Sequence, residues 1–339
     1  MTLYAFDDID DAIAATRSFL WPFDLGRWAK LALVAFFLGG VGGFNPFSWT
    51  SSTPPTGGGG GMPSDPGSFP ALGAPELAII GLIVAVILVV GLLFLLVGSI
   101  MEFVFVESLR HERVSLRRYW SERWGQGLRL FGFRFALGIL TLAVVALLGF
   151  AVLAPVVLGN GTPSVAVALL AILVFVVVAV VTGLVQGFTT VFVVPIMVLE
   201  DRGVLSAWRR FWPTMTGQWK QYLTYVVMGF VLQLAAGLVT GIVMIVLAIL
   251  LAIPFVVLGL VGAGMLAVSS LAGWVVIGVV VALYLLAIFV VGAFVAVPVQ
   301  AFLRYYALLI LGDTEESFDL IPERRATIRG EETGDASPS

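Results

Sequence analysis

The sequence predicts an all-α polytopic membrane protein with six transmembrane helices, arranged as three repeated units of one interfacial helix and two spans. Of the 339 residues, 60% are hydrophobic and 12% are charged, whereas soluble domains contain about 25% charged residues. Several apolar runs exceed about 18 residues, the length that favours a membrane-spanning helix. The third observation is a motif that occurs twice, each time directly before a long apolar run.

The repeated motif reads Arg-Arg-aromatic-Trp, then four residues, then Gly-Gln. It occupies residues 117–126 and again residues 209–218. A weaker third copy lies within residues 17–28 and ends in Gly26-Arg27-Trp28. Parallel repeats of this kind predict rough symmetry about the membrane normal.

The remaining elements follow from composition. Residues 1–43 contain an acidic segment, an interfacial helix and a short first span; residues 44–75 form a flexible Gly/Pro-rich external loop; residues 77–311 form the membrane body; and residues 312–339 form a disordered acidic cytoplasmic tail. Five consecutive glycines at 57–61 exclude helix and strand within the loop. Amphipathic helices over 107–126 and 200–218 divide the body, with turns near 159–163 and 262–273.

The basic residues fix the orientation. None of the 18 Lys and Arg residues lies in the loops near 44–75, 159–163 and 262–273. The positive-inside rule therefore predicts a protein of the cell membrane with both termini and both amphipathic helices in the cytoplasm.

The amphipathic helices are the first candidate site, at the lipid interface. Trp favours the headgroup layer and Arg favours anionic phosphates. The candidate residues are Arg117, Arg118, Trp120, Arg209, Arg210 and Trp212. Two interpretations stay open: topology anchors, which we favour, or a cytoplasmic platform that binds membrane lipid or a protein partner.

Polar residues inside the apolar runs are the second candidate, as an intramembrane site. They are Glu102, Gln186, Gln233 and Gln300. A buried Gln more often bonds a neighbouring helix than a substrate, and no ionisable residue lies clearly at the middle of a span. The pattern gives little support to proton- or ion-coupled transport.

Other chemistry finds no support in the residue inventory. The chain has no Cys and a single His, His111, which argues against a metal site or a nucleophilic triad. No phosphate-binding loop signature is present, so we expect no cofactor. The membrane position and acidic tail argue against nucleic acid. We expect no catalytic residues and no enzyme activity.

One stretch resembles a known family. The run from Glu200 to Trp212, which follows Val194-Pro195, is similar to a motif in the membrane domain attached to some glycerophosphoryl diester phosphodiesterases. The similarity is clearest over residues 190–225. It implies the six-span fold and a role beside an enzyme, without the separate catalytic barrel. The excess of Arg over Lys and a pI of about 5.2 suggest a halophilic archaeon.

Two functions follow as hypotheses. The first is a non-catalytic scaffold that organises lipid or a partner enzyme at the cytoplasmic face. The alternative is a transporter or flippase for a small or amphiphilic molecule. A polar cavity lined by Gln186 and Gln233 would favour the alternative.

Overall fold

The computed structural model describes residues 4–39, 74–158, 161, 162 and 164–335. Its helices are α1 (Tyr4–Leu20), α2 (Leu25–Gly39), α3 (Ala74–Arg110), α4 (Leu116–Val157), α5 (Val165–Phe188), α6 (Val194–Glu200), α7 (Val204–Gly217), α8 (Trp219–Met265), α9 (Ser270–Thr314) and α10 (Pro322–Asp335). A π-helical turn, η2 (Thr189–Val193), joins α5 to α6, and a 3₁₀ turn, η3 (Glu316–Phe318), precedes α10. No strand occurs in these ranges, which confirms the all-α class.

Five helical segments are long and apolar enough to cross a membrane, which indicates a membrane protein. They are Leu77–Arg110, Leu116–Val157, Val165–Glu200, Trp219–Met265 and Ser270–Thr314. The remaining predicted span, the first in the chain, begins in α2, whose 15 residues correspond to about 23 Å at 1.5 Å per residue. This is shorter than the hydrocarbon core of about 30 Å. Its continuation, and most of the predicted loop at 44–75, lie outside the described residues.

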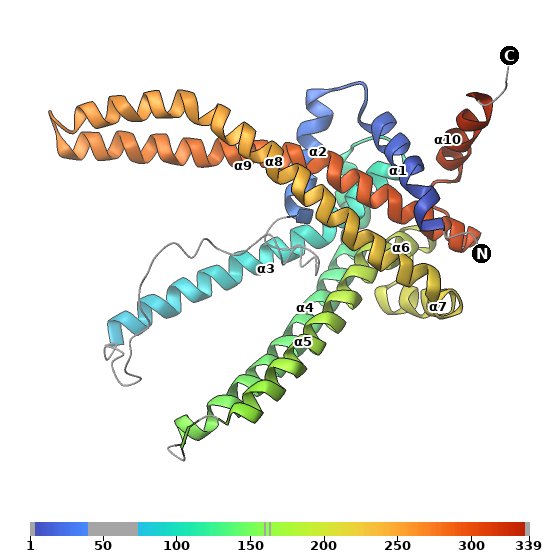
Figure 1. Cartoon of the computed structure of the whole chain (residues 1–339), viewed down its shortest axis with the longest axis horizontal. Helices are drawn as coiled ribbons and strands as arrows, with labels where there is room; N and C mark the ends of the chain where they lie inside the picture. The colour runs from blue at the N-terminus through green and yellow to red at the C-terminus, as the bar shows by residue number, and fades with distance from the viewer. Residues whose placement is uncertain (1–3, 40–73, 159–160, 163, 336–339) are drawn as a thin grey trace.

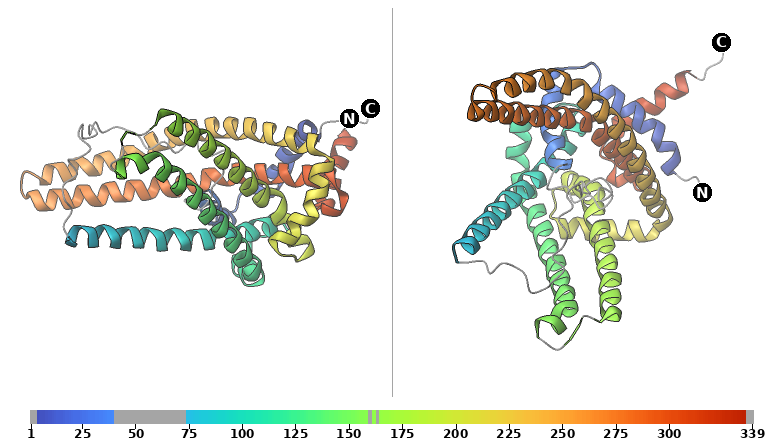
Figure 2. Two further views of the ribbon diagram at one scale, coloured as in Figure 1. Left: turned by 90° about the horizontal axis from the view of Figure 1, so that it is seen from below. Right: turned by 60° about the vertical axis from the view of Figure 1, so that its left-hand side comes forward.

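The helices form a hub from which three arms diverge, as Figures 1 and 2 show. We define the hub as residues 4–39, 96–134, 189–232 and 293–335. The arms are the outer part of α3, the α4–α5 hairpin and the α8–α9 hairpin. All 18 Lys and Arg residues lie in the hub, and residues 77–95, 135–188 and 233–292 carry no charge.

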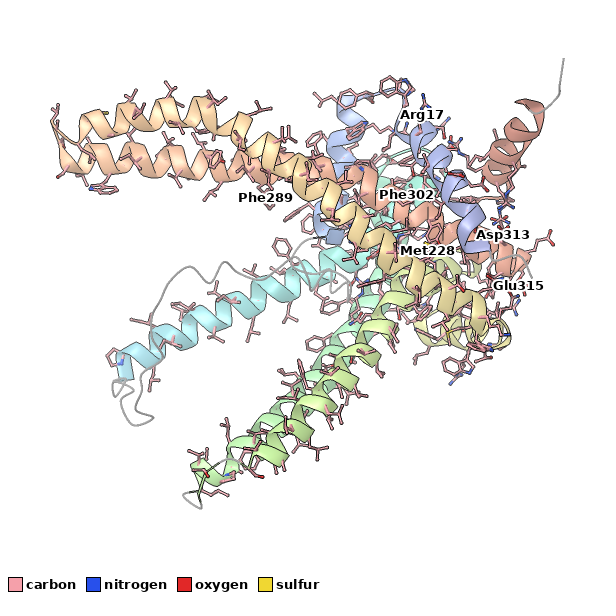
Figure 3. The ribbon with its side chains drawn as sticks, viewed as in Figure 1. Arg17, Met228, Phe289, Phe302, Asp313 and Glu315 are labelled. Carbon is pink, nitrogen blue, oxygen red and sulfur yellow. The ribbon has the colours of Figure 1, made fainter. Side chains whose placement is uncertain are left out.

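The hub contains the apolar core of the described chain. An aromatic cluster lies at its centre, where the ring centroid of Phe192 is 5.5 Å from Phe211 and 5.3 Å from Tyr222. Helix α1 packs along α9 and inserts Phe19 against Tyr305, with the centroids 5.9 Å apart. The arms, in contrast, expose their apolar side chains (Figure 3), as segments surrounded by lipid would.

The two copies of the motif differ in backbone structure. The expected separate helix over 107–126 is split, because α3 ends at Arg110 and α4 then begins at Leu116 and runs through Gln126 without a break. In the second copy α7 ends at Gly217, and Gln218 leaves the helical conformation before α8. The second copy carries Pro and two Thr where the first has Ser, Glu and Trp, and these residues lower helix propensity.

The C-terminal segment differs from the expected disordered tail over its described part. Residues 312–314 complete α9, and η3 and α10 follow. Phe318, Leu320, Ile321 and Ile328 are buried in the core of the hub. Four apolar side chains among the charges give this segment a face that can pack, which its acidic composition concealed. Residues 336–339 lie outside the described residues.

Candidate functional site

The first polar constellation is a buried junction where α3, α4 and α9 meet. Glu102 lies between two guanidiniums: Arg134 Nη2 donates to Oε1 at 3.2 Å, and Arg304 Nη2 donates to Oε2. The three residues are only 5%, 8% and 7% exposed, respectively. Two arginines and one glutamate leave a formal excess of one positive charge in the interior.

Thr190 in the π-helical turn completes this junction. Its hydroxyl accepts a hydrogen bond from Arg134 Nη2 at 2.7 Å, and its carbonyl accepts one from Arg304 Nη1 at 2.5 Å. The carbonyl has no helical donor, because Pro195 carries no N–H and the N–H of Val194 donates to the carbonyl of Thr189. The proline therefore creates an acceptor that Arg304 satisfies, which lets α9 dock on the turn.

A second polar network joins α3, α4 and α6. The Glu107 carboxylate is 4% exposed and accepts from Arg123 Nε at 2.9 Å. Gln126 donates its amide to the carbonyl of Met197 at 3.0 Å and to Asp201 Oδ1 at 2.6 Å. Asp201 has a left-handed backbone (φ 51°) and ends α6, so Gln126 bonds the last turn of that helix.

Gln218, the counterpart of Gln126 in the second copy, makes a similar contact. Its amide donates to the carbonyl of Thr314 at 2.8 Å, in the last turn of α9. The last carbonyls of a helix lack intrahelical partners. The Gln of each copy thus satisfies a carbonyl at the end of the helix that returns from the following hairpin.

A cavity of about 500 Å³ lies between the end of α3 and the first turns of α4. Its lining consists of four arginines, two glutamates, a histidine and a tyrosine: Arg110, Arg113, Arg118, Arg123, Glu107, Glu122, His111 and Tyr119. Counting His as neutral, the lining carries a formal charge of +4 − 2 = +2. Such a cavity attracts anions.

A cluster of ion pairs holds α1, α9 and α10 together at the hub end of α9, where Asp313 lies (Figure 3). Arg329 reaches Asp8 at 3.1 Å, Asp11 at 2.9 Å and Asp313 at 2.7 Å. Burial raises the pKa of Asp8 to about 8, and the Asp313 carboxylate adds to the rise more than Arg329 opposes it.

Comparison with known proteins identifies the family. The family of unknown function DUF7544 matches residues 3–321. The chain belongs to DUF7544. No curated protein and no solved structure matches it.

In this DUF7544 chain the two arginines of each motif differ in environment. Arg118 pairs with Glu122 at 2.9 Å. Arg210 lies 3.5 Å from Glu200 and 5.2 Å above the ring of Phe318. The preceding arginines, Arg117 and Arg209, are exposed, and neither forms an ion pair within the part of the chain that the structure describes.

The tryptophans of the motifs also differ. Trp120 is half-buried and stacks at a tilt on Trp124, with the centroids 5.6 Å apart. Trp212 is 54% exposed. Each motif therefore presents one unpaired arginine, and the second copy also presents a largely exposed indole ring.

Among the described residues, hydrogen bonds and ion pairs do not join the predicted intramembrane residues into one site. Glu102 is the centre of the buried junction, whereas Gln186, Gln233 and Gln300 are half-buried. Among the described residues no hydrogen bond joins any of the three glutamines to Glu102. The sequence analysis counted Arg134 and Arg304 only as charges that set the orientation, and it missed their role in the junction. The available signal was that both arginines lie close to the end of a long uncharged segment, as Glu102 does.

Proposed function

We propose that this protein is a non-catalytic scaffold of the cell membrane whose hub faces the cytoplasm and organises anionic lipid or a partner enzyme. The observation that supports this proposal most is the distribution of charge: every Lys and Arg lies in the hub, and the arms have none. The positive-inside rule favours a cytoplasmic hub and two cytoplasmic termini. Six spans in three units remain part of this proposal, and the matching bonds of Gln126 and Gln218 support two of the units.

The lipid contact is assigned to Arg117 and Arg209. Both are exposed and precede an arginine already engaged by a carboxylate. Arg209 lies near the exposed indole of Trp212 in the sequence, and indoles favour the headgroup layer. A guanidinium can bind a lipid phosphate through two parallel hydrogen bonds.

Retention of anionic lipid by the purified protein tests this proposal. Native mass spectrometry would compare the wild type with the double variant Arg117→Gln/Arg209→Gln and with its charge-conserving control, Arg117→Lys/Arg209→Lys. We expect the Gln variant to retain less phosphatidylglycerol and the Lys variant to retain an intermediate amount, because an ammonium keeps the charge without the planar fork. Equal retention by all three proteins would refute the lipid contact.

A partner enzyme is the second part of the scaffold proposal. The similarity of residues 200–212 to a membrane domain found beside phosphodiesterases supports an enzyme of phosphodiester metabolism. Crosslinking and co-purification from native membranes would test for this partner. Recovery of the protein without an enriched enzyme would contradict it.

Transport is the alternative, and the buried junction supports it. Ionisable groups near the membrane are functional candidates by default, and Glu102, Arg134 and Arg304 carry a net positive charge in the interior. Against transport, each oxygen of Glu102 already accepts a hydrogen bond. Proteoliposomes with fluorescent phospholipid would decide between the two: movement between leaflets that the wild type accelerates over protein-free vesicles would replace the scaffold proposal.

A further inference from the structure

The cavity between α3 and α4 is separate from the proposed lipid contact, because neither Arg117 nor Arg209 lines it. We propose that this cavity binds a phosphate-bearing anion through Arg110 and Arg113. The inference goes beyond the scaffold proposal and can fail independently of it.

The charges of the cavity are only partly neutralised. The carboxylate of Glu107 lies within 3.2 Å of both Arg123 and His111. Glu122 lies 2.9 Å from Arg118. Both carboxylates of the lining are therefore engaged.

Arg110 and Arg113 are the charges that remain. Both are exposed and line the same cavity, and within the described ranges neither forms an ion pair. Two guanidiniums that share one cavity repel each other until an anion lies between them.

The loop that places these two arginines is fixed by the surrounding hub. Glu112 lies between them with a left-handed backbone (φ 52°), a conformation that is costly for a residue other than glycine. Arg27 donates to the carbonyl of Glu112 at 3.2 Å, and Arg324 lies 2.7 Å from its carboxylate. A binding loop held in place before the ligand arrives loses less entropy on binding.

The opposite wall is also held in place. Arg123 donates to Glu107 and, at 3.2 Å, to Gln126, so this guanidinium is held in place in the lining. The ring of His111 stacks on Tyr119, with the centroids 6.2 Å apart. This pair is the sole aromatic part of the lining.

The lining selects the chemical class of the ligand. Several guanidiniums favour phosphate, whose oxygens accept several charge-assisted hydrogen bonds, over a singly bound carboxylate. A volume of about 500 Å³ lies within the range of about 300–1,000 Å³ for small-molecule sites. The polar lining fits a small phosphate ester, either the headgroup of a phospholipid or a soluble metabolite.

Calorimetry on the full chain in nanodiscs of zwitterionic lipid tests the site, with glycerol 3-phosphate as the probe and glycerol as the phosphate-free control. We expect the wild type to bind glycerol 3-phosphate and not glycerol. The variant Arg110→Gln/Arg113→Gln should bind the probe at least about tenfold more weakly, since each lost charge-assisted bond weakens affinity by about this factor. Arg113→Glu, a second and independent variant, should show a larger loss.

The matched control is Arg17→Gln/Arg129→Gln, which removes two exposed arginines outside the cavity and should bind the probe as the wild type does. Nanodiscs that contain phosphatidylglycerol separate the two sources of phosphate. Weaker probe binding in these discs would assign the site to lipid headgroups, and unchanged binding would assign it to a soluble ester. A wild type that does not bind the probe in zwitterionic discs, or cavity variants that bind it unchanged, would overturn the proposal.

Discussion

Neutralising the carboxylate of Glu102 should destabilise the hub more than removing either of its arginine partners. In the variant Glu102→Gln, the guanidiniums of Arg134 and Arg304 keep their burial and lose the only carboxylate that either contacts in the described structure. The side chain keeps its size, so the change tests charge and hydrogen bonding with little change in packing.

The expected loss of free energy of unfolding follows from the two charged guanidiniums that stay buried in the variant. Removing one partner of a buried ion pair costs about 3–5 kcal/mol, because an uncompensated charge remains. Glu102 pairs with two guanidiniums that are 8% and 7% exposed, so we expect Glu102→Gln to lose free energy of unfolding in that range. Arg134→Gln leaves a neutral Glu102–Arg304 pair and removes hydrogen bonds to a charged group, which costs about 1.5–3 kcal/mol.

Equilibrium unfolding in mixed micelles with rising dodecyl sulfate content, followed by tryptophan fluorescence, would measure both losses. Glu122→Gln is the control, since its pair with Arg118 is exposed and exposed pairs contribute little. The reasoning is refuted if Arg134→Gln destabilises the protein as much as Glu102→Gln, or if Glu102→Gln unfolds as the wild type does.

Three further changes have defined outcomes. A Cβ at Gly127 would lie 2.5 Å from Cγ1 and 3.0 Å from Cα of a residue on α3, whereas one at Gly125 would meet no atom within 4 Å; Gly127→Ala should therefore lower the free energy of unfolding by about 1–3 kcal/mol, and Gly125→Ala should raise or preserve it. The pKa of Asp8 lies near 8 in the folded protein, above its ordinary value of 3.8, so the folded state holds this proton more tightly; the resulting stabilisation falls steadily as the pH rises from the ordinary pKa and is gone above about 8. Thermal unfolding between pH 6 and 9 should show this loss in the wild type and a flatter profile in Asp8→Asn. A cysteine at Ser269 should react with an impermeant thiol reagent from outside the cell and one at Ser206 should not; the reverse pattern would contradict the orientation.

Composition was sufficient to predict the all-α class and the long apolar helices. The hydropathy of five segments marks them as candidate spans whatever the tertiary structure. The hub was not predicted, because hydropathy does not say where a helix leaves the membrane. Helix α8 has 47 residues and is about 70 Å long, more than twice the thickness of the hydrocarbon core.

The contacts of the candidate sites were beyond sequence reasoning because they join distant segments. Glu102 and Arg304 are 202 residues apart in the chain, and no local pattern pairs them. Pro195 indicates a carbonyl without a helical donor about one turn before it, but which carbonyl this is depends on the π-helical turn. The π-helical turn itself is not visible in the sequence.

The motif was found from the sequence, but its Gln was given no function. The structure shows that Gln126 and Gln218 each donate to a carbonyl near the end of a returning helix. Amphipathic spacing had drawn attention to the arginines and tryptophans instead. Of these, Arg118 and Arg210 are engaged by carboxylates. A helical projection reveals the i,i+4 pair of Arg118 with Glu122 but not the pair of Arg210, because Glu200 belongs to another helix.

The polar contacts of the hub also explain how the arms can hold a defined arrangement. Lipid provides no hydrophobic force that would draw one apolar hairpin toward another, and the arm surfaces are almost wholly apolar. Within each hairpin a hydrogen bond joins the two helices: Thr141 bonds Thr182 in the α4–α5 hairpin, and Tyr284 donates to the carbonyl of Ala248 in the α8–α9 hairpin. The relative placement of the arms is then set at their base, by the apolar core of the hub and by directional bonds such as those of Glu102. Glu107, which lines the proposed anion cavity, lies on α3 as Glu102 does, so a ligand in that cavity would contact the helix that carries these bonds.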